Sequence, residues 1–140
     1  RTILEIKGLQ HVNIVVKDVD FSRKFYCDIL GMDEKPRHPS FQLVGAWLHK
    51  NGAEIHLIQE DHATHPPGDI SVDYIETATN ELSASRHFCL VIDDTDDLVR
   101  ILEENNIAIV YGPITRTGGL IQTYCYDPDN HLIEFSEFPK

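Results

Sequence analysis

The sequence has 140 residues, which suits one domain or two small halves that share one core. Its hydrophobic fraction of 41% is ordinary for a folded protein, and its formal net charge of −11 disfavours nucleic acid and anionic membrane surfaces as partners. No apolar run approaches the roughly 20 residues of a membrane-spanning helix, and no signal peptide is visible. Because Cys27, Cys89 and Cys125 are odd in number and widely spaced, we interpret them as buried, unreactive thiols of a cytoplasmic protein.

Two stretches that resemble each other organise the chain. Residues 10–18 and 86–94 each begin with a polar residue and a histidine, continue as an apolar run and reach an aspartate seven residues past the histidine. Each stretch then passes into a segment with helical spacing. An internal repeat with a histidine in register predicts a duplicated architecture and a candidate site together.

The first half follows a lead-in, residues 1–9, in which Ile3, Leu4 and Ile6 are candidates for packing. A strand is predicted over residues 11–16, then a helix capped by Asp18 or Asp20 that ends near residue 30 at Gly31. Residues 41–48 and 53–59 read as strands joined by a turn at Asn51-Gly52, with room for one more short strand before residue 41. The apolar row of the predicted helix is Phe21, Phe25 and Ile29.

The second half repeats this order after a connector, residues 60–84. We predict a strand over residues 87–92, a helix from Thr95 to Asn105-Asn106, and strands over residues 107–111, 120–126 and 131–136. The buried row of this helix is Leu98, Ile101 and Leu102. The prediction is one α+β domain over residues 1–140, with module one at about 8–59 and module two at about 85–138.

Four ligand-type side chains occupy equivalent places in the two modules. His11 and His87 open the first strands, while His56 and Glu134 lie in the last strands, each four residues past a turn residue. Three imidazoles and one carboxylate suit Zn, Ni, Co, Mn or Fe(II), and the set lacks the thiolates of a closed structural zinc site. One divalent metal held by these four groups would keep one or two positions open. Glu54 shares the strand face of His56 and is an alternative ligand.

The remaining histidines sit in turns or in the connector, where we expect them to be solvent-exposed, and His62 and His65 are candidates for a lid over the site. These residues are His38, His49, His62, His65 and His131.

The chain resembles the vicinal-oxygen-chelate superfamily, which includes glyoxalase I, bleomycin-resistance proteins and extradiol dioxygenases. The resemblance is carried by residues 9–18, by Phe25-Tyr26 and Leu30-Gly31, by the opening at His87, and by residues 127–134, where Asn130 stands in place of the family's glycine. It implies two tandem βαβββ modules that form a curved, open, barrel-like mixed sheet around a metal site, and it implies a homodimer. The chain departs from typical glyoxalase I at His56, where that enzyme usually has glutamate.

The function that the resemblance implies is a divalent-metal-dependent, glyoxalase-like lyase or isomerase. It would act on a small oxygen-chelating substrate through an enediolate-type intermediate, with Glu134 as the proton-transferring base. Alternatives are a metal-dependent dioxygenase or thiol transferase, and a resistance-type binding module without turnover. For Trp47, the core or a dimer interface is an alternative place, and for the two arginines a solvated surface is the alternative. The candidate substrate-binding residues are Asn13, Arg37, Trp47, Arg116, Gln122 and Tyr124.

Overall fold

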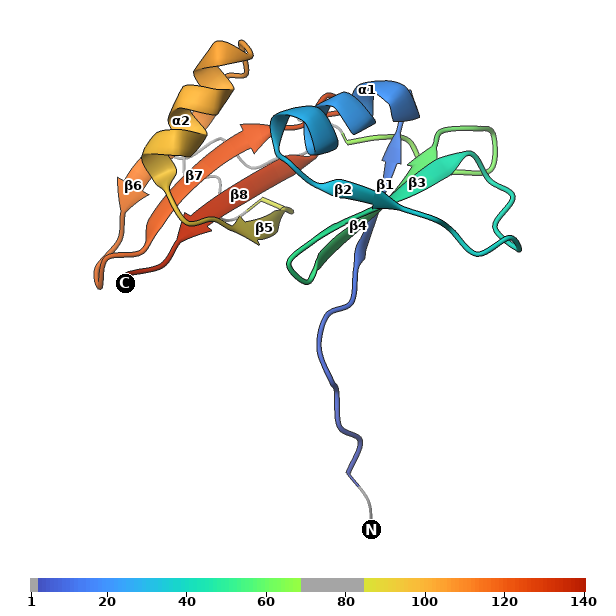
Figure 1. Ribbon diagram of the computed structural model, residues 1–140, viewed down its shortest axis with the longest axis horizontal. Helices are drawn as coiled ribbons and strands as arrows, with labels where there is room; N and C mark the ends of the chain where they lie inside the picture. Colours follow the sequence, from blue (N-terminus) through green and yellow to red (C-terminus); the bar gives the residue numbers. More distant parts are fainter. Residues whose placement is uncertain (1–2, 69–84) are drawn as a thin grey trace.

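The structure is a computed structural model that describes residues 3–68 and 85–140 (Figure 1). Module one contains β1 (Val12–Val16), α1 (Val19–Arg23), the π-helical turn η1 (Lys24–Ile29), β2 (Asp33–Lys35), β3 (Gly45–Lys50) and β4 (Ala53–Gln59). Module two contains β5 (Phe88–Val91), α2 (Thr95–Glu104), β6 (Ile109–Thr115), β7 (Ile121–Tyr126) and β8 (Leu132–Glu137). Each module is therefore a strand, a helical segment and three further strands, as the repeat predicted.

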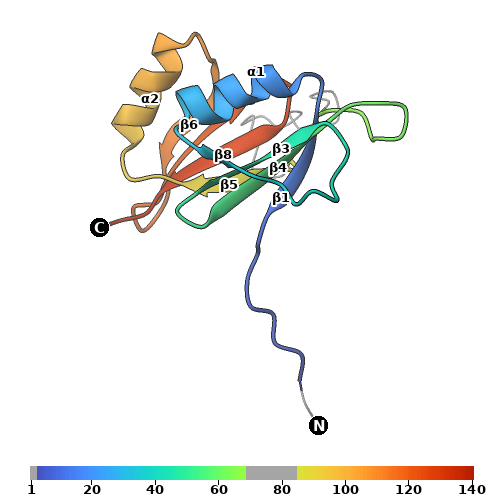
Figure 2. The ribbon, with the colours of Figure 1, turned by 45° about the vertical axis from the view of Figure 1, so that its right-hand side comes forward.

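The two modules have the same sheet topology. The strand order is β1-β4-β3-β2 in one four-stranded sheet and β5-β8-β7-β6 in the other. The first strand of each module runs parallel to the last one, and the remaining pairs are antiparallel. Figures 1 and 2 show two curved, open sheets with the helices on one side. The predicted α+β class with tandem βαβββ modules is confirmed.

The turns follow from local sequence. Asn51 and Gly52 both have positive φ, at 49° and 89°, and join β3 to β4 in the tight hairpin that an Asn-Gly pair favours. Asn130 also adopts the left-handed conformation, with φ 65°, so asparagine serves in place of glycine before β8. This turn sets the position of Glu134 along the last strand.

The first helical segment differs from the predicted apolar row. Phe21 is 63% exposed, and the buried residues of the segment are Val19, Ser22, Phe25 and Tyr26. The chain passes from α1 directly into the wider π-helical turn η1, so spacing by four residues no longer keeps side chains on one face. Asp18 caps α1 by accepting a hydrogen bond from the Asp20 amide at 2.8 Å.

The second helix begins at Thr95, as the sequence predicted. The carboxylate of Asp94 caps it by accepting a hydrogen bond from the Asp97 amide at 3.1 Å. Leu98 and Leu102 are buried as predicted, and Asn105 ends the helix.

One hydrophobic core contains residues of both modules. Ile55 and Leu57 of β4 and Ile133 and Phe135 of β8 belong to the same buried cluster. Because side chains alternate along a strand, His56 and Glu134 lie on the face of their sheets that points away from this core. The core therefore fixes which face of each module carries the predicted ligands.

Polar contacts also join the modules. The buried hydroxyl of Tyr26 donates to Oδ2 of Asp127 at 2.7 Å. Nε2 of His131 lies 2.6 Å from the carbonyl oxygen of Val15 in β1. The prediction of an exposed His131 was therefore wrong, because this ring bonds to the backbone of the other module, whereas His38, His49, His62 and His65 are exposed.

The lead-in to β1 does not pack on the body of the chain. Ile3, Leu4 and Ile6 are 87%, 85% and 84% exposed, so their expected packing is absent from the structure. Within residues 3–68 and 85–140, no helix is long and apolar enough to cross a membrane. Most of the connector, residues 69–84, lies outside the described residues.

Candidate metal centre

The first module brings His11 and His56 together. His56 projects from β4 and is 9% exposed, and His11 lies just before β1. Their rings stack with centroids 3.8 Å apart and planes 15° apart. Trp47, the cross-strand partner of His56 on β3, stacks with the same imidazole at 4.4 Å. Since two parallel rings cannot share one face at these distances, His56 lies between Trp47 and His11.

Glu54 orients the imidazole of His56. Its Oε2 lies 2.6 Å from Nε2 of His56, and its Oε1 accepts from Nζ of Lys35 at 2.6 Å. The hydrogen bonds from Lys35 and then from His56 lower the pKa of Glu54 to about 2. An ionised carboxylate only accepts, so Nε2 of His56 carries a hydrogen, and Nδ1 retains the lone pair that a metal requires. In this structure Glu54 thus accepts a hydrogen bond from His56 and orients its ring.

The second module brings His87 and Glu134 together. Nδ1 of His87 lies 2.7 Å from the backbone carbonyl of Ser85, and Nε2 lies 3.0 Å from Oε1 of Glu134. A carbonyl only accepts, so Nδ1 carries the hydrogen, and in a neutral ring the lone pair of Nε2 faces the carboxylate. Two electron-rich atoms at 3.0 Å require a positive charge between them, which either a second proton or a metal cation supplies.

Glu134 is held by several donors. Oε1 accepts from the Tyr124 hydroxyl at 2.9 Å, and Oε2 accepts from Nε2 of Gln122 at 3.0 Å and from the hydroxyl of Ser136. The thiol of Cys89 donates to Oε2 at 3.4 Å. Burial alone would raise the pKa of Glu134, but the hydrogen bonds from these four side chains lower it to about 2. The carboxylate is therefore ionised at neutral pH, as a metal ligand must be.

Cys125 is buried as predicted, but Cys89 on the edge strand β5 is exposed and Cys27 is half-buried, so the prediction of buried thiols was wrong for these two.

Within the described residues, the four predicted ligands form two pairs. His11 contacts His56 and His87 contacts Glu134, but no group of three or more His, Cys, Asp or Glu side chains is close enough to hold a metal in residues 3–68 and 85–140 of one copy. The donor chemistry of each pair fits a divalent cation, because each offers imidazole nitrogen and the second adds an anionic oxygen. The complete four-ligand site stays a prediction.

A groove of about 760 Å³ runs along the outer edge of β1. Asn13 lies on one wall, Arg86 and His87 lie on another, and residues 65–68 border it. His65 and His87 line the same groove, and the role of His65 in a lid stays a prediction.

The predicted substrate-binding residues divide between the two pairs. Gln122 and Tyr124 donate to Glu134, and Nε of Arg116 donates to Oε1 of Gln122 at 2.6 Å. These three residues are therefore linked by hydrogen bonds to the His87–Glu134 pair. Trp47 stacks on His56 and so belongs with the His11–His56 pair. Arg37 is half-buried in the loop between β2 and β3.

Sequence reasoning missed several residues that support the two pairs. Lys35 of β2 pairs with Glu54 of β4, the Ser85 carbonyl fixes the ring of His87, and Ser136 donates to Glu134. Arg86 lines the groove. The position of Ser136, two residues past Glu134 on the same strand face, was the one available signal.

Comparisons with known proteins identify the family of the chain. The family model of the Glyoxalase/Bleomycin resistance protein/Dioxygenase superfamily matches residues 8–135. Among curated relatives, "Glyoxalase domain-containing protein RDO1" of Mycosarcoma maydis is 30% identical, covering 96% of this chain and 70% of the relative. "Glyoxylase I 4" of Arabidopsis thaliana is 29% identical (94% and 71%), and "Metallothiol transferase FosB" of Staphylococcus haemolyticus is 28% identical (92% and 82%).

Among solved structures, a glyoxalase family protein from Bacillus anthracis superposes with a TM-score of 0.75 at 22% identity, covering 99% of this chain and all of that one. This likeness concerns the fold. With the family model spanning both modules, and with the repeated βαβββ topology, the chain belongs to the Glyoxalase/Bleomycin resistance protein/Dioxygenase superfamily.

Proposed function

We propose that this protein is a metal-dependent enzyme of the glyoxalase type, a lyase or isomerase that acts on a small substrate with two neighbouring oxygen atoms. One divalent cation would be held by His11, His56, His87 and Glu134. The observation that carries the proposal is the His87–Glu134 contact, in which a hydrogen on Nδ1 leaves the lone pair of Nε2 facing an ionised carboxylate at 3.0 Å. Both atoms would serve as ligands of a divalent cation, which would replace the proton that otherwise joins them.

The chain's own residues divide the chemistry between them. A divalent metal at this place would polarise two adjacent substrate oxygens and acidify the C–H bond beside them. Glu134 is the carboxylate of the predicted ligand set, and it would take the proton from one carbon and return it to the next. Tyr124 and Gln122 orient its two oxygens and keep it ionised. Arg116, bonded to Gln122, lies where it can pair with a substrate anion.

We further propose that the working enzyme is a homodimer in which the two halves of the site come from different copies. Within the described part of one chain, the ligands form two separate pairs, so a centre with four ligands needs the pairs to meet. A two-fold axis between module one of one copy and module two of the other would create two equivalent sites.

The test is metal analysis of the purified protein, followed by activity on hemithioacetals. We expect about one Zn, Ni, Co, Mn or Fe per chain, loss of most of this metal in His87→Ala and Glu134→Gln, and retention in the matched variants His49→Ala and Glu103→Gln, whose side chains are exposed. Metal content unchanged by either site variant would overturn the proposal.

The second candidate is a metal-dependent thiol transferase, favoured by the 28% identity to "Metallothiol transferase FosB" over 92% of the chain. The metal-loaded protein distinguishes the two reactions. Isomerisation of a hemithioacetal without consumption of free thiol supports the first candidate. Consumption of one thiol for each epoxide opened, with no isomerisation, supports the second.

A further inference from the structure

The segment before β1 is an extended arm that the rest of the described chain does not cover. Residues 3–9 project from the body of the molecule in both views (Figures 1 and 2). Ile3, Leu4, Ile6 and Leu9 are 84% to 89% exposed. Single exposed aliphatic side chains are common, but four within seven residues form an apolar surface that marks an interaction site. The arm leads directly into His11, so its binding partner also positions a predicted ligand.

A free sheet edge lies beside the equivalent histidine of module two. Within the part of the chain that the structure describes, β5 pairs with β8 alone, so its other edge presents unpaired N–H and C=O groups. Such an edge is a template for an added strand. Val91 on β5 is 70% exposed.

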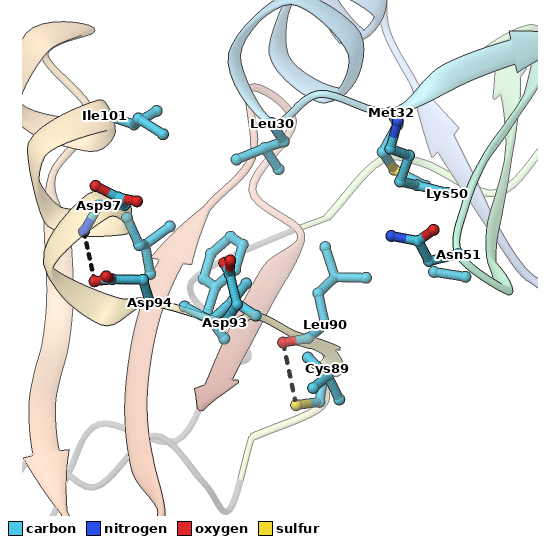
Figure 3. A pocket seen from close by; sticks show the side chains of 15 residues that line it. Leu30, Met32, Lys50, Asn51, Cys89, Leu90, Asp93, Asp94, Asp97 and Ile101 are labelled. Carbon is cyan, nitrogen blue, oxygen red and sulfur yellow. Dashed lines mark hydrogen bonds between the residues drawn. The ribbon is translucent and has the colours of Figure 1, made fainter. Parts of the chain in front are cut away.

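An apolar cleft opens next to this edge. It measures about 430 Å³ and lies between the end of η1, the β3–β4 hairpin, β5 and α2. Figure 3 shows Leu30 at the end of η1, Leu90 of β5 and Ile101 of α2 reaching into it, and Cys89 of β5 also lines it. Asp93, Asp94 and Asp97 also line it. An apolar floor with carboxylates beside it suits an aliphatic segment that carries a cation.

We propose that residues 6–10 of one copy add as an antiparallel strand to the free edge of β5, along residues 88–92, in a second copy. The orientation rests on the proposed function, in which His11 of one copy lies beside His87 of the other. Antiparallel pairing from that point sets Leu9 opposite Cys89 and Ile6 opposite Ile92. Two-fold symmetry then covers both arms in one closed dimer.

The alternation of side chains supports this register. Ile6, opposite Ile92, falls on the same face as Leu90 and Ile92, both of which line the cleft, so this aliphatic side chain enters the cleft. Residues 3 and 4 would lie beyond the strand, opposite the cap and first residue of α2. Lys7 falls on the other face, diagonal to Asp93, where opposite charges attract within a chain of net charge −11. A second copy is the occupant because each chain has one arm and one free β5 edge, so two copies can cover both arms and both edges.

The first test is a disulfide between the arm and the edge. In the full chain, Leu9→Cys should cross-link with the native, exposed Cys89 under mild oxidation and give a band of twice the chain mass on a non-reducing gel. Adding Cys89→Ser should abolish that band, and the control variant Phe21→Cys, which is also exposed but lies on α1, should not form it. A missing band in Leu9→Cys, or a band that survives Cys89→Ser, would overturn the inference.

The second test is the oligomeric state. Ile6→Asp should weaken dimerisation at least tenfold in sedimentation equilibrium, while Phe21→Asp should leave it unchanged; an unweakened Ile6→Asp dimer overturns the inference. Thermal unfolding checks that both variants fold. If the cross-link forms but no metal binds, the arm inference stands and the proposed function fails. If metal binds through all four ligands without the cross-link, the reverse holds.

Discussion

At the scale of single residues, Trp47 is a built-in reporter of the first half-site. It is the one tryptophan of the chain, and its ring stacks on His56 at 4.4 Å. Metal binding to His56 changes the charge beside the indole, so we expect a saturable change in tryptophan fluorescence when Zn²⁺ is titrated into metal-free protein. The change should vanish in His56→Ala and persist in His49→Ala. A titration that is identical in all three proteins would contradict the assignment of His56.

The lowered pKa of Glu134 makes the free energy of unfolding depend on pH in the acid range. Its pKa in the fold is about 2, below its ordinary value of 4.5, so the ionised group stabilises the fold above about pH 4.5 and this contribution is lost as the pH falls toward 2. The full contribution is roughly 3 kcal/mol at most, from a shift of about 2.5 units. In urea unfolding across this pH range, metal-free Glu134→Gln should show a flatter dependence than the wild type, while the exposed Glu103→Gln should follow the wild type. Parallel curves for the wild type and Glu134→Gln would contradict the stabilising role.

At the scale of elements, the cap of α2 is carried by one side chain. Asp94→Ala removes the acceptor of the Asp97 amide and should lower the free energy of unfolding by about 1 kcal/mol. Asp96→Ala, in the same first turn and exposed, loses only its favourable interaction with the helix dipole and should cost about half as much or less. Denaturant unfolding at neutral pH measures both, and equal losses would show that Asp94 acts by charge alone.

The elements were predictable wherever local chemistry decides them. The Asn51-Gly52 hairpin, the strand at residues 53–59 and the helix from Thr95 follow from turn residues, alternation and apolar spacing. The first helix was predicted with the wrong buried row, because the chain enters a π-helical turn after Arg23 and the spacing of four residues no longer follows one face. Alternation along a strand does not distinguish an edge from a central position either, so the free edge of β5 was not predictable.

At the scale of the whole molecule, Tyr26 and Asp127 join the two modules in a buried contact. Tyr26→Phe keeps the ring and removes the hydroxyl donor, which leaves a buried carboxylate oxygen without this partner. We expect a loss of roughly 1–3 kcal/mol in urea unfolding, because an unsatisfied buried acceptor carries its full desolvation penalty. Burial raises the pKa of Asp127, and loss of the tyrosine donor should raise it further. Unchanged stability of Tyr26→Phe would show that this bond adds nothing to the union of the modules.

The sequence by itself determined the duplicated βαβββ plan, the turns and the identity of four ligand-type side chains, because periodicity, turn chemistry and an in-register repeat are local properties of the chain. Only the tertiary structure decided how those side chains are held. The shared core turns His56 and Glu134 to the sheet faces that point away from it. Glu54 fixes the imidazole of His56, and the Ser85 carbonyl fixes that of His87. One copy presents two pairs of predicted ligands, with an exposed arm before His11. These outcomes depend on contacts between residues far apart in the chain, which no local pattern encodes.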